Sequence, residues 1–333
     1  MTQLNPDARR KIDVHAHYLP PGYADQMRRA GMIHPDGMPD YPQWSPQLAL
    51  DMYDEFGIET AMLSISSPGV HCGNDAAARR LARQVNDAGA ELVIKYPGRF
   101  GLFAVLSMPD VEASLQEIAY AFDVLHADGI GLKTNALGIY LGDQRFDPIF
   151  DELNRRSATV FIHPTSTTCW QSCAMGYPRP MIEFPFDTAR AVTNLIFSGT
   201  LERCSNLHII VSHNGGVVPF LADRIAKMGN QLKLNQPGAA DPISYMRRLY
   251  YDTAMTGSKY SLSSLLQLTD VSHILYGSDW PWYPEAGVQA TNQDLESSTF
   301  FTDQERSAIY RENALGFLPP AISQTAAAAA AAK

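Results

Sequence analysis

Short β-rich apolar runs alternate with amphipathic helical patterns along this chain from residue 11 to residue 317. Eight of these runs are predicted to be strands: 11–14, 60–65, 100–106, 129–133, 159–162, 208–211, 249–252 and 273–276. Strand and helix units in strict alternation predict one (β/α)8 TIM barrel over residues 1–317, with an insertion at about 18–50 after the first strand. An open doubly wound sheet is the alternative, but no glycine-rich phosphate loop follows any of the strands.

Composition excludes several other classes of protein. The chain has 333 residues, of which 45% are hydrophobic, enough to build the large core of a barrel. A net charge of −9 argues against nucleic acid as a partner, and no apolar stretch is long enough to span a membrane. The N-terminal MTQLNPDARRK lacks the apolar core of a secretory signal, which predicts a cytoplasmic protein. Residues 318–333, with their run of alanines, form a tail to which we assign no function.

Two histidines stand one residue apart, His15 and His17, at the end of the first predicted strand. Residues two apart in a strand point to the same side, so we expect Ile12 and Val14 to anchor one face and some of Asp13, His15 and His17 to share the other. Converging imidazoles are typical of a transition-metal site. Taken alone, however, the pair is equally compatible with solvated or hydrogen-bonded side chains.

Three further polar residues follow other predicted strands. His163 comes after the fifth strand, His213 after the sixth and Asp279 after the eighth. A barrel brings the carboxyl ends of its strands around one axis, so these residues and His17 are expected at the catalytic face. The pattern therefore predicts a metal site there.

The motifs VHAH, IHP, SHNGG and GSDWPW, in this order, resemble the amidohydrolase superfamily, and within it the branch of aminocarboxymuconate semialdehyde decarboxylase and the aromatic acid decarboxylases. The resemblance extends from Lys11 to about Phe317. The phrases KIDVHAHYLPPGY, DGMPDYPQWSP and EFPFDTARAVTNLIFSG are most similar to the 6-methylsalicylate decarboxylase type of that branch.

This resemblance implies that His15, His17, His163 and Asp279 bind one divalent metal, for which zinc is favoured and manganese is the alternative. It also implies catalytic roles for His213 and Asp279. Two routes for the proton stay open: Asp279 delivers it with help from His213, or a water activated by the metal and His213 does so.

The resemblance further implies a homodimer, because Arg224 matches an arginine that reaches the active site of a neighbouring subunit to bind a carboxylate. The alternative is an ordinary surface arginine of a helix. The stretch HPDGMPDYPQW, which ends at Trp44, contains no arginine, whereas the semialdehyde decarboxylase has one there for a second carboxylate; this makes a dicarboxylate substrate less expected. Trp170 and Phe184, in the loop after the fifth strand, are predicted to bind an aromatic ring, although such side chains are also common in cores. Lys133 is predicted to be a barrel or salt-bridge residue and not a bridge between two metals.

The function that the resemblance implies is metal-dependent, nonoxidative decarboxylation of a small aromatic acid of the salicylate type, with 6-methylsalicylate giving m-cresol and CO2. A hydrolase or lactonase of the same superfamily is the alternative. A catalytically silent barrel is the least favoured reading, since every expected ligand is present.

Overall fold

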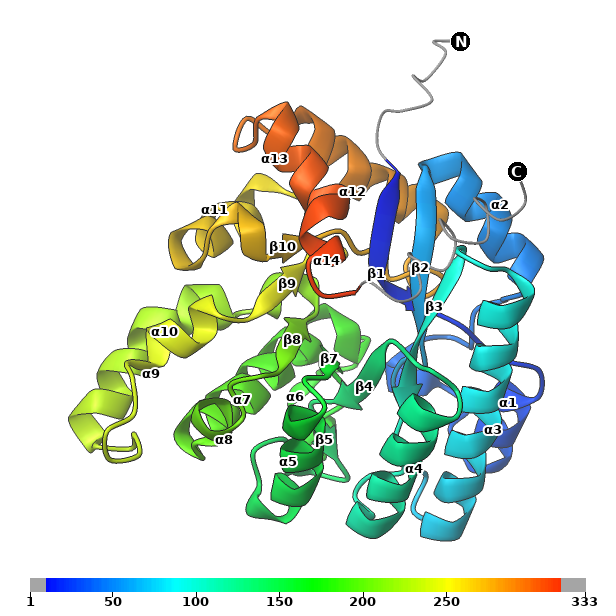
Figure 1. The fold of residues 1–333 in the computed structure, drawn as a ribbon, viewed down its shortest axis with the longest axis horizontal. Coiled ribbons are helices and arrows are strands. Elements are labelled where there is room, and N and C mark those ends of the chain that lie inside the picture. The colour runs from blue at the N-terminus through cyan, green and yellow to red at the C-terminus, as the bar shows by residue number, and fades with distance from the viewer. Residues whose placement is uncertain (1–9, 319–333) are drawn as a thin grey trace.

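Eight parallel strands form a barrel in the computed structural model, which describes residues 10–318 (Figure 1). The strands, in the order in which they pair, are β1 Lys11–His17, β2 Ile58–Ser64, β3 Phe100–Val105, β4 Gly129–Lys133, β7 Thr159–His163, β8 His208–Val211, β9 Tyr250–Asp252 and β10 Ile274–Leu275. All eight predicted strands are confirmed, and with them the TIM barrel. A two-stranded antiparallel hairpin of β5 (Asn135–Ala136) and β6 (Ile139–Tyr140), which the sequence pattern does not reveal, follows β4.

Backbone contacts between the last and the first strand regions close the barrel. The amide of Val14 donates to the carbonyl of Tyr276 at 3.0 Å, and the amide of Asp279 donates to the carbonyl of His15 at 2.7 Å. Ala16 also pairs with Trp280 in a parallel bridge. This closure excludes the open doubly wound sheet, and it places the segment after β10 directly beside the histidines of β1.

Helices surround the barrel and connect its strands (Figure 1). They are α1 Tyr23–Arg29, α2 Pro46–Phe56, α3 Asp75–Lys95, α4 Val111–Asp123, α5 Asp147–Arg155, α6 Trp170–Cys173, α7 Glu183–Phe197, α8 Thr200–Arg203, α9 Val218–Leu232, α10 Pro242–Arg247, α11 Lys259–Leu268, α12 Glu285–Ser297, α13 Asp303–Ser307 and α14 Asn313–Leu315. Short helical turns are η1 Pro35–Gly37, η2 Gln144–Phe146, η3 Arg179–Met181, η4 His213–Gly215, η5 Val271–His273 and η6 Ala308–Glu312. Side chains of Ser45, Asn74 and Asp110 cap the starts of α2, α3 and α4 by accepting a backbone amide hydrogen bond, which explains where these helices begin.

The alternation expected for the first strand is wrong. Ile12 and Val14 pack in one buried cluster with Phe161, and the ring of Phe161 also lies 5.0 Å from that of His15. The register of β1 against β2 shifts between Asp13 and Ala16, so the two-residue period is interrupted there. Because of this irregularity, Ile12 and Val14 pack inside the barrel against Phe161, the same ring that His15 contacts.

The insertion after β1 contains α1 and η1 and leads into α2. Asp36 of η1 adopts a left-handed backbone conformation (φ 50°) and accepts a hydrogen bond from the hydroxyl of Ser166, which follows β7. The insertion is thereby attached to the loop after the fifth strand of the barrel. The division into a barrel over 1–317 and a tail stays a prediction, and residues 319–333 of that tail lie outside the described residues.

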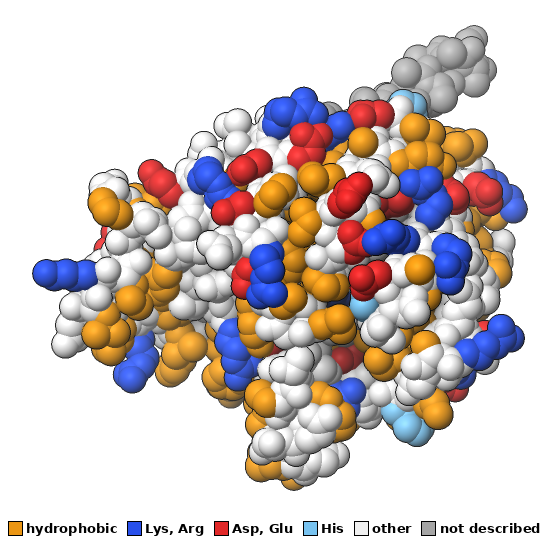
Figure 2. Space-filling view, turned by 90° about the horizontal axis from the view of Figure 1, so that it is seen from below, with side chains coloured by type: hydrophobic (Ala, Val, Ile, Leu, Met, Phe, Trp, Pro, Cys, Tyr) orange, Lys and Arg blue, Asp and Glu red, His pale blue; other side chains and the backbone are white. Residues whose placement is uncertain are grey.

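Charged side chains of both signs are interspersed on the face drawn in Figure 2. Within residues 10–318, no helix is both long and apolar enough to cross a membrane. The cellular compartment stays a prediction.

Candidate metal centre

Four side chains converge at the carboxyl ends of the barrel strands: His15 and His17 of β1, His163 of β7, and Asp279 after β10. One ligand atom from each lies within 4.8 Å of those of the others, and all four residues are buried. The structure therefore brings together the complete set of ligands that the sequence predicts, in a group that we call the tetrad.

The Nδ1 atom of each tetrad histidine is already engaged. That of His15 lies 3.0 Å from Oδ2 of Asp252, and that of His163 lies 2.7 Å from the carbonyl oxygen of Pro164. For His17 the partner is the hydroxyl of Ser64 at 2.9 Å, which itself donates to the carbonyl of Ala16 and so accepts from the ring. These hydrogen bonds assign the ring proton of each histidine to Nδ1. The Nε2 atom of each ring is then left with a free lone pair, directed away from these partners.

Those lone pairs lack partners of the usual kind. The Nε2 atoms of His15 and His17 are only 3.1 Å apart, and neither carries the proton if Nδ1 does. Nε2 of His163 is buried without a hydrogen-bond partner, and Oδ1 of Asp279 lies 3.1 Å from Nε2 of His17 and 3.3 Å from Nε2 of His15. Since buried polar atoms rarely stay unpaired and facing lone pairs repel, this arrangement fits a cation at the point of convergence. Three imidazoles and one carboxylate form a donor set that suits a divalent transition metal.

Electrostatics of the tetrad also favour one positive charge there. Burial lowers the pKa of His17 to about 4 and holds the pKa of His163 well below its usual value. Burial opposes a charge on His15 as well, but the carboxylates of Asp252 and Asp279 outweigh it and raise the pKa of His15 to about 10. Although burial opposes ionisation of Asp279, the neighbouring histidines keep its pKa well below the ordinary value. A proton on His15 and a metal ion therefore compete for the same place.

His213 lies beside the tetrad without being part of it. It begins η4, which Ser212 separates from the end of β8, and it has a left-handed backbone conformation (φ 55°). Its amide donates to Oδ1 of Asp252 at 3.0 Å. Its Nε2 lies 3.2 Å from Oδ2 of Asp279. Asp279 thus turns one oxygen to the tetrad and the other to His213, an arrangement that allows a proton to pass between the two side chains.

Asp252 is the residue of this centre that the sequence reasoning missed. It ends β9, the seventh strand of the barrel, and is completely buried. The sequence does contain a signal for Asp252, because it ends a predicted strand just as His163 follows one. Acidic residues are seldom fully buried unless they have a partner. A buried acid at the end of a strand therefore indicates a partner, whereas an exposed acid there only caps the strand.

A cavity of about 510 Å³ opens above the tetrad. His163, His213 and Asp279 line it, while His15 and His17 are completely buried beneath. Its other walls are largely apolar or aromatic: Met38, Pro178, Phe184, Met255, Trp282 and Tyr283. This combination of a polar floor and apolar walls suits a small ring that carries an acidic group.

The remaining predicted site residues do not all lie at the cavity above the tetrad. Phe184 lines this cavity, with its ring centroid 5.9 Å from that of His163. Trp170 instead lines a second, neighbouring cavity, where the guanidinium of Arg179 covers its ring at 4.1 Å. Arg224 is exposed on α9 and is not among the residues that line either cavity. Lys133 ends β4, lines the second cavity and donates to the carbonyl of Ile65 at 2.6 Å, so it is not a ligand of the tetrad.

Comparisons with known proteins agree with this geometry. A family model described as amidohydrolase matches residues 12–319. A protein of Aspergillus niger named decarboxylase yanB is 36% identical over 93% of this chain and 87% of its own length. The 6-methylsalicylic acid decarboxylase acuB of Aspergillus aculeatus is 35% identical over 93% of this chain and 96% of its own. A crystal structure described as amidohydrolase II, at 31% identity, covers 93% of this chain and 99% of its own with a TM-score of 0.88.

Proposed function

We propose that this chain, which belongs to the amidohydrolase family, is a metal-dependent decarboxylase of a small aromatic hydroxy acid, with 6-methylsalicylate as the substrate and m-cresol and CO2 as the products. The observation that carries the proposal is the tetrad at the floor of an apolar cavity, beside the pair His213 and Asp279. Relatives that are identical to this chain at more than a third of the aligned positions bear the name decarboxylase, which favours this chemistry over a hydrolase or lactonase.

The tetrad is proposed to hold one divalent ion, through Nε2 of each of its histidines and a carboxylate oxygen of Asp279. When bound, such an ion supplies Lewis acidity that stabilises negative charge on the oxygens of a hydroxy acid. Zinc fits the three imidazoles best, and manganese is the alternative because a carboxylate completes the set. The supporting observation is the unpaired Nε2 of His163, which points to an ion of some kind.

The chemistry needs a proton on the ring carbon that bears the carboxylate. In this step a carbon–hydrogen bond forms at that carbon, the bond to the carboxylate then breaks, CO2 leaves, and its bonding electrons restore the aromatic ring. We assign the delivery of the proton to Asp279 in contact with His213, because their side chains lie 3.2 Å apart and both line the cavity. Since the pKa of Asp279 is low, its carboxylate holds this proton only in passing. The carboxylate loses its water shell against the apolar walls, which favours departure of neutral CO2.

The walls of the cavity support a ring with one carboxylate and an apolar substituent. Met38, Phe184 and Trp282 offer flat or flexible apolar surface, and no arginine or lysine is among the lining residues. A second carboxylate would therefore meet no arginine or lysine supplied by the same chain among these lining residues. This argument favours a methyl-substituted salicylate over a dicarboxylic acid.

The quaternary arrangement is a separate part of the proposal. Phe220, Arg224 and Met228 follow one another at four-residue spacing on α9 and are all exposed, with Phe220 exposed to 81%. Residues four apart on a helix share one face, so an arginine stands here between two large apolar side chains. We propose that this face docks on a second copy of the chain and brings Arg224 toward the partner's cavity. Figure 2 shows hydrophobic side chains gathered at the end of the molecule where α9 and α10 lie.

The deciding experiment is incubation of purified protein, stripped with a chelator and reloaded with zinc or manganese, with 6-methylsalicylate. We expect CO2 and m-cresol in equal amounts, and no product before metal is restored. A panel of lactones and esters serves as the comparison. Turnover of a lactone without release of CO2 from any salicylate would replace the decarboxylase by a hydrolase.

A further inference from the structure

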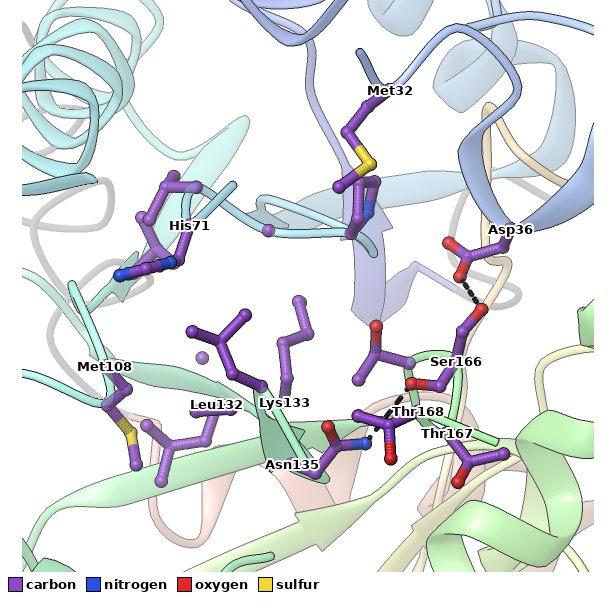
Figure 3. A pocket seen from close by; sticks show the side chains of 18 of the residues that line it. Met32, Asp36, His71, Met108, Leu132, Lys133, Asn135, Ser166, Thr167 and Thr168 are labelled. Atoms are coloured by element: carbon purple, nitrogen blue, oxygen red, sulfur yellow. Dashed lines mark hydrogen bonds between the residues drawn. The ribbon is translucent and has the colours of Figure 1, made fainter. Parts of the chain in front are cut away.

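A second cavity, of about 260 Å³, lies next to the first (Figure 3). Asp36 lines both, and the hydroxyl of Ser67 in the wall of the first cavity lies 2.7 Å from that of Thr165 in the second. The wall between the cavities therefore includes two side-chain hydrogen bonds, Asp36 with Ser166 and Ser67 with Thr165. None of the proposed chemistry uses this second space.

Two cations line the second cavity without an ion pair. Figure 3 shows Lys133 pointing from the end of β4 into the middle of the space. Its ammonium donates to the carbonyl of Ile65, a neutral acceptor, and none of the ion pairs found within residues 10–318 involves Lys133. Its two other protons are left directed to the cavity.

Arg179 is the other cation. Its Nε donates to the hydroxyl of Ser166 at 2.7 Å, and its guanidinium lies over the ring of Trp170. Among the described residues no hydrogen bond of its two terminal amino groups is found, and no ion pair holds it. Surface arginines of this protein behave otherwise: Arg145, Arg155 and Arg203 each contact a carboxylate.

One acid lies among the lining residues, and it offsets only part of this charge. Asp36 attracts both Lys133 and Arg179, but its carboxylate accepts a hydrogen bond from the hydroxyl of Ser166 and forms no ion pair with either cation among the described residues. His71 lies against Asp75, with Nε2 2.8 Å from the carboxylate. The cavity thus carries an excess of positive charge together with apolar surface from residues such as Leu132 and Met108.

We propose that the second cavity is a binding site for a small carboxylate or bicarbonate, a planar oxyanion that Lys133 and Arg179 bind together. An ammonium and a guanidinium are the donors that proteins use for planar oxyanions. Here two of them share one cavity with a single carboxylate that forms an ion pair with neither, so a bound anion would balance the remaining charge. Burial also lowers the pKa of Lys133 to about 7, and a bound anion would restore its charge. The cavity volume admits molecules from bicarbonate to a benzoate-sized acid.

The test measures thermal unfolding of the metal-loaded protein with sodium acetate, benzoate or bicarbonate, against chloride at the same ionic strength. A ligand that binds the native state raises Tm, and at ten times its Kd we expect a rise of about 2 °C. Lys133→Met and Arg179→Gln should each abolish that rise. Lys227→Met, which removes an exposed cation of α9 outside both cavities, should retain it.

A second readout does not depend on any variant of the cations. Because the ring of Trp170 lies under Arg179, binding should change the fluorescence of the wild type and not that of Trp170→Phe. Repeating both measurements on chelator-treated protein distinguishes this site from the tetrad, since an anion bound to the metal would lose its effect there. If only bicarbonate or only benzoate raises Tm, that anion is the kind of oxyanion that the second cavity binds.

The proposal is overturned if no anion raises Tm, if the rise survives both cation substitutions, or if it requires the metal. It does not rest on the decarboxylase function. A protein that binds acetate at Lys133 and Arg179 but releases no CO2 from 6-methylsalicylate would contradict only the proposed reaction.

Discussion

Oδ2 of Asp252 lies 3.0 Å from Nδ1 of His15, although 237 positions separate the two residues in the chain. The other oxygen of Asp252 accepts hydrogen bonds from the amides of His213 and Ala254. One carboxylate thus orients a tetrad ring and holds the backbone that carries the neighbouring histidine. Carboxylates in this position fix the tautomer of a metal-binding histidine and increase its basicity.

Replacement of this carboxylate by an amide tests its role. In Asp252→Asn the amide oxygen retains an acceptor for the backbone, but the negative charge facing His15 is lost. We expect affinity for zinc or manganese to fall about 10- to 100-fold, measured by competition with a chromophoric chelator. Asp223→Asn, an equally small change on exposed α9, is the control and should leave the affinity unaltered. Equal affinities in the two variants would contradict the role given to Asp252.

Removal of the acid at Asp279 separates metal binding from proton transfer. The three histidines keep most of the donor set in Asp279→Asn, so a fraction of the metal should stay bound, while the side chain beside His213 can no longer deliver a proton. We expect kcat for decarboxylation to fall by about 100-fold or more at saturating metal. Metal content is measured on the same samples, and full activity in this variant would assign the proton to another group.

The convergence of the tetrad residues was predictable because fold and position are linked: in a barrel, residues that follow strands meet at one end whatever their separation in sequence. Asp252 occupies such a position, but only the closed barrel shows that its oxygen faces His15. The shift within β1 was not predictable, since a bulge interrupts the two-residue period without a marker such as glycine between Asp13 and Ala16. Trp170 and Phe184 could not be assigned to different cavities, because a loop has no period that fixes which side a residue faces.

Asp13 gives the stability a defined dependence on pH. Its carboxyl is completely buried, Oδ1 accepts the amides of His15 and Ser278, and Oδ2 has no hydrogen-bond partner. Burial raises the pKa of Asp13 from the ordinary 3.8 to about 7. Between these values the folded protein keeps a proton that the unfolded chain has released. Its contribution to stability is therefore complete below about pH 4 and is lost as the pH rises through about 7.

Asp13→Asn retains the Oδ1 acceptor and removes the titration. We expect the decline in the free energy of unfolding of metal-free protein between pH 4 and 7 to become shallower, by at most about 1.4 kcal/mol per pH unit, the limit for a single proton. Urea unfolding at several pH values measures this slope. An unchanged slope would show that Asp13 is ionised in the folded protein.

Phe184 and Trp170 allow a matched comparison of the two cavities. Phe184→Leu keeps an apolar side chain but removes the ring from the cavity above the tetrad, so kcat/KM for 6-methylsalicylate should fall about 2- to 10-fold, as expected for one lost aromatic contact. Trp170→Leu alters the neighbouring cavity and should leave that constant unchanged. The reverse result would place the substrate ring beside Arg179.

Arg224 is tested by complementation between two inactive variants. Arg224→Gln leaves the tetrad intact, whereas His163→Gln removes a tetrad ligand and retains Arg224. If Arg224 serves the partner's cavity, a mixed dimer contains one complete site, built from the tetrad of the first chain and the arginine of the second. Random pairing of equal amounts should then restore about one quarter of the wild-type activity per chain. If Arg224 acts within its own chain, or only on the surface, unfolding and refolding the mixture restores nothing beyond the sum of the two variants. Cross-linking or light scattering on the same mixture reports whether dimers have formed, so that a lack of recovery in dimeric protein argues directly against the shared site.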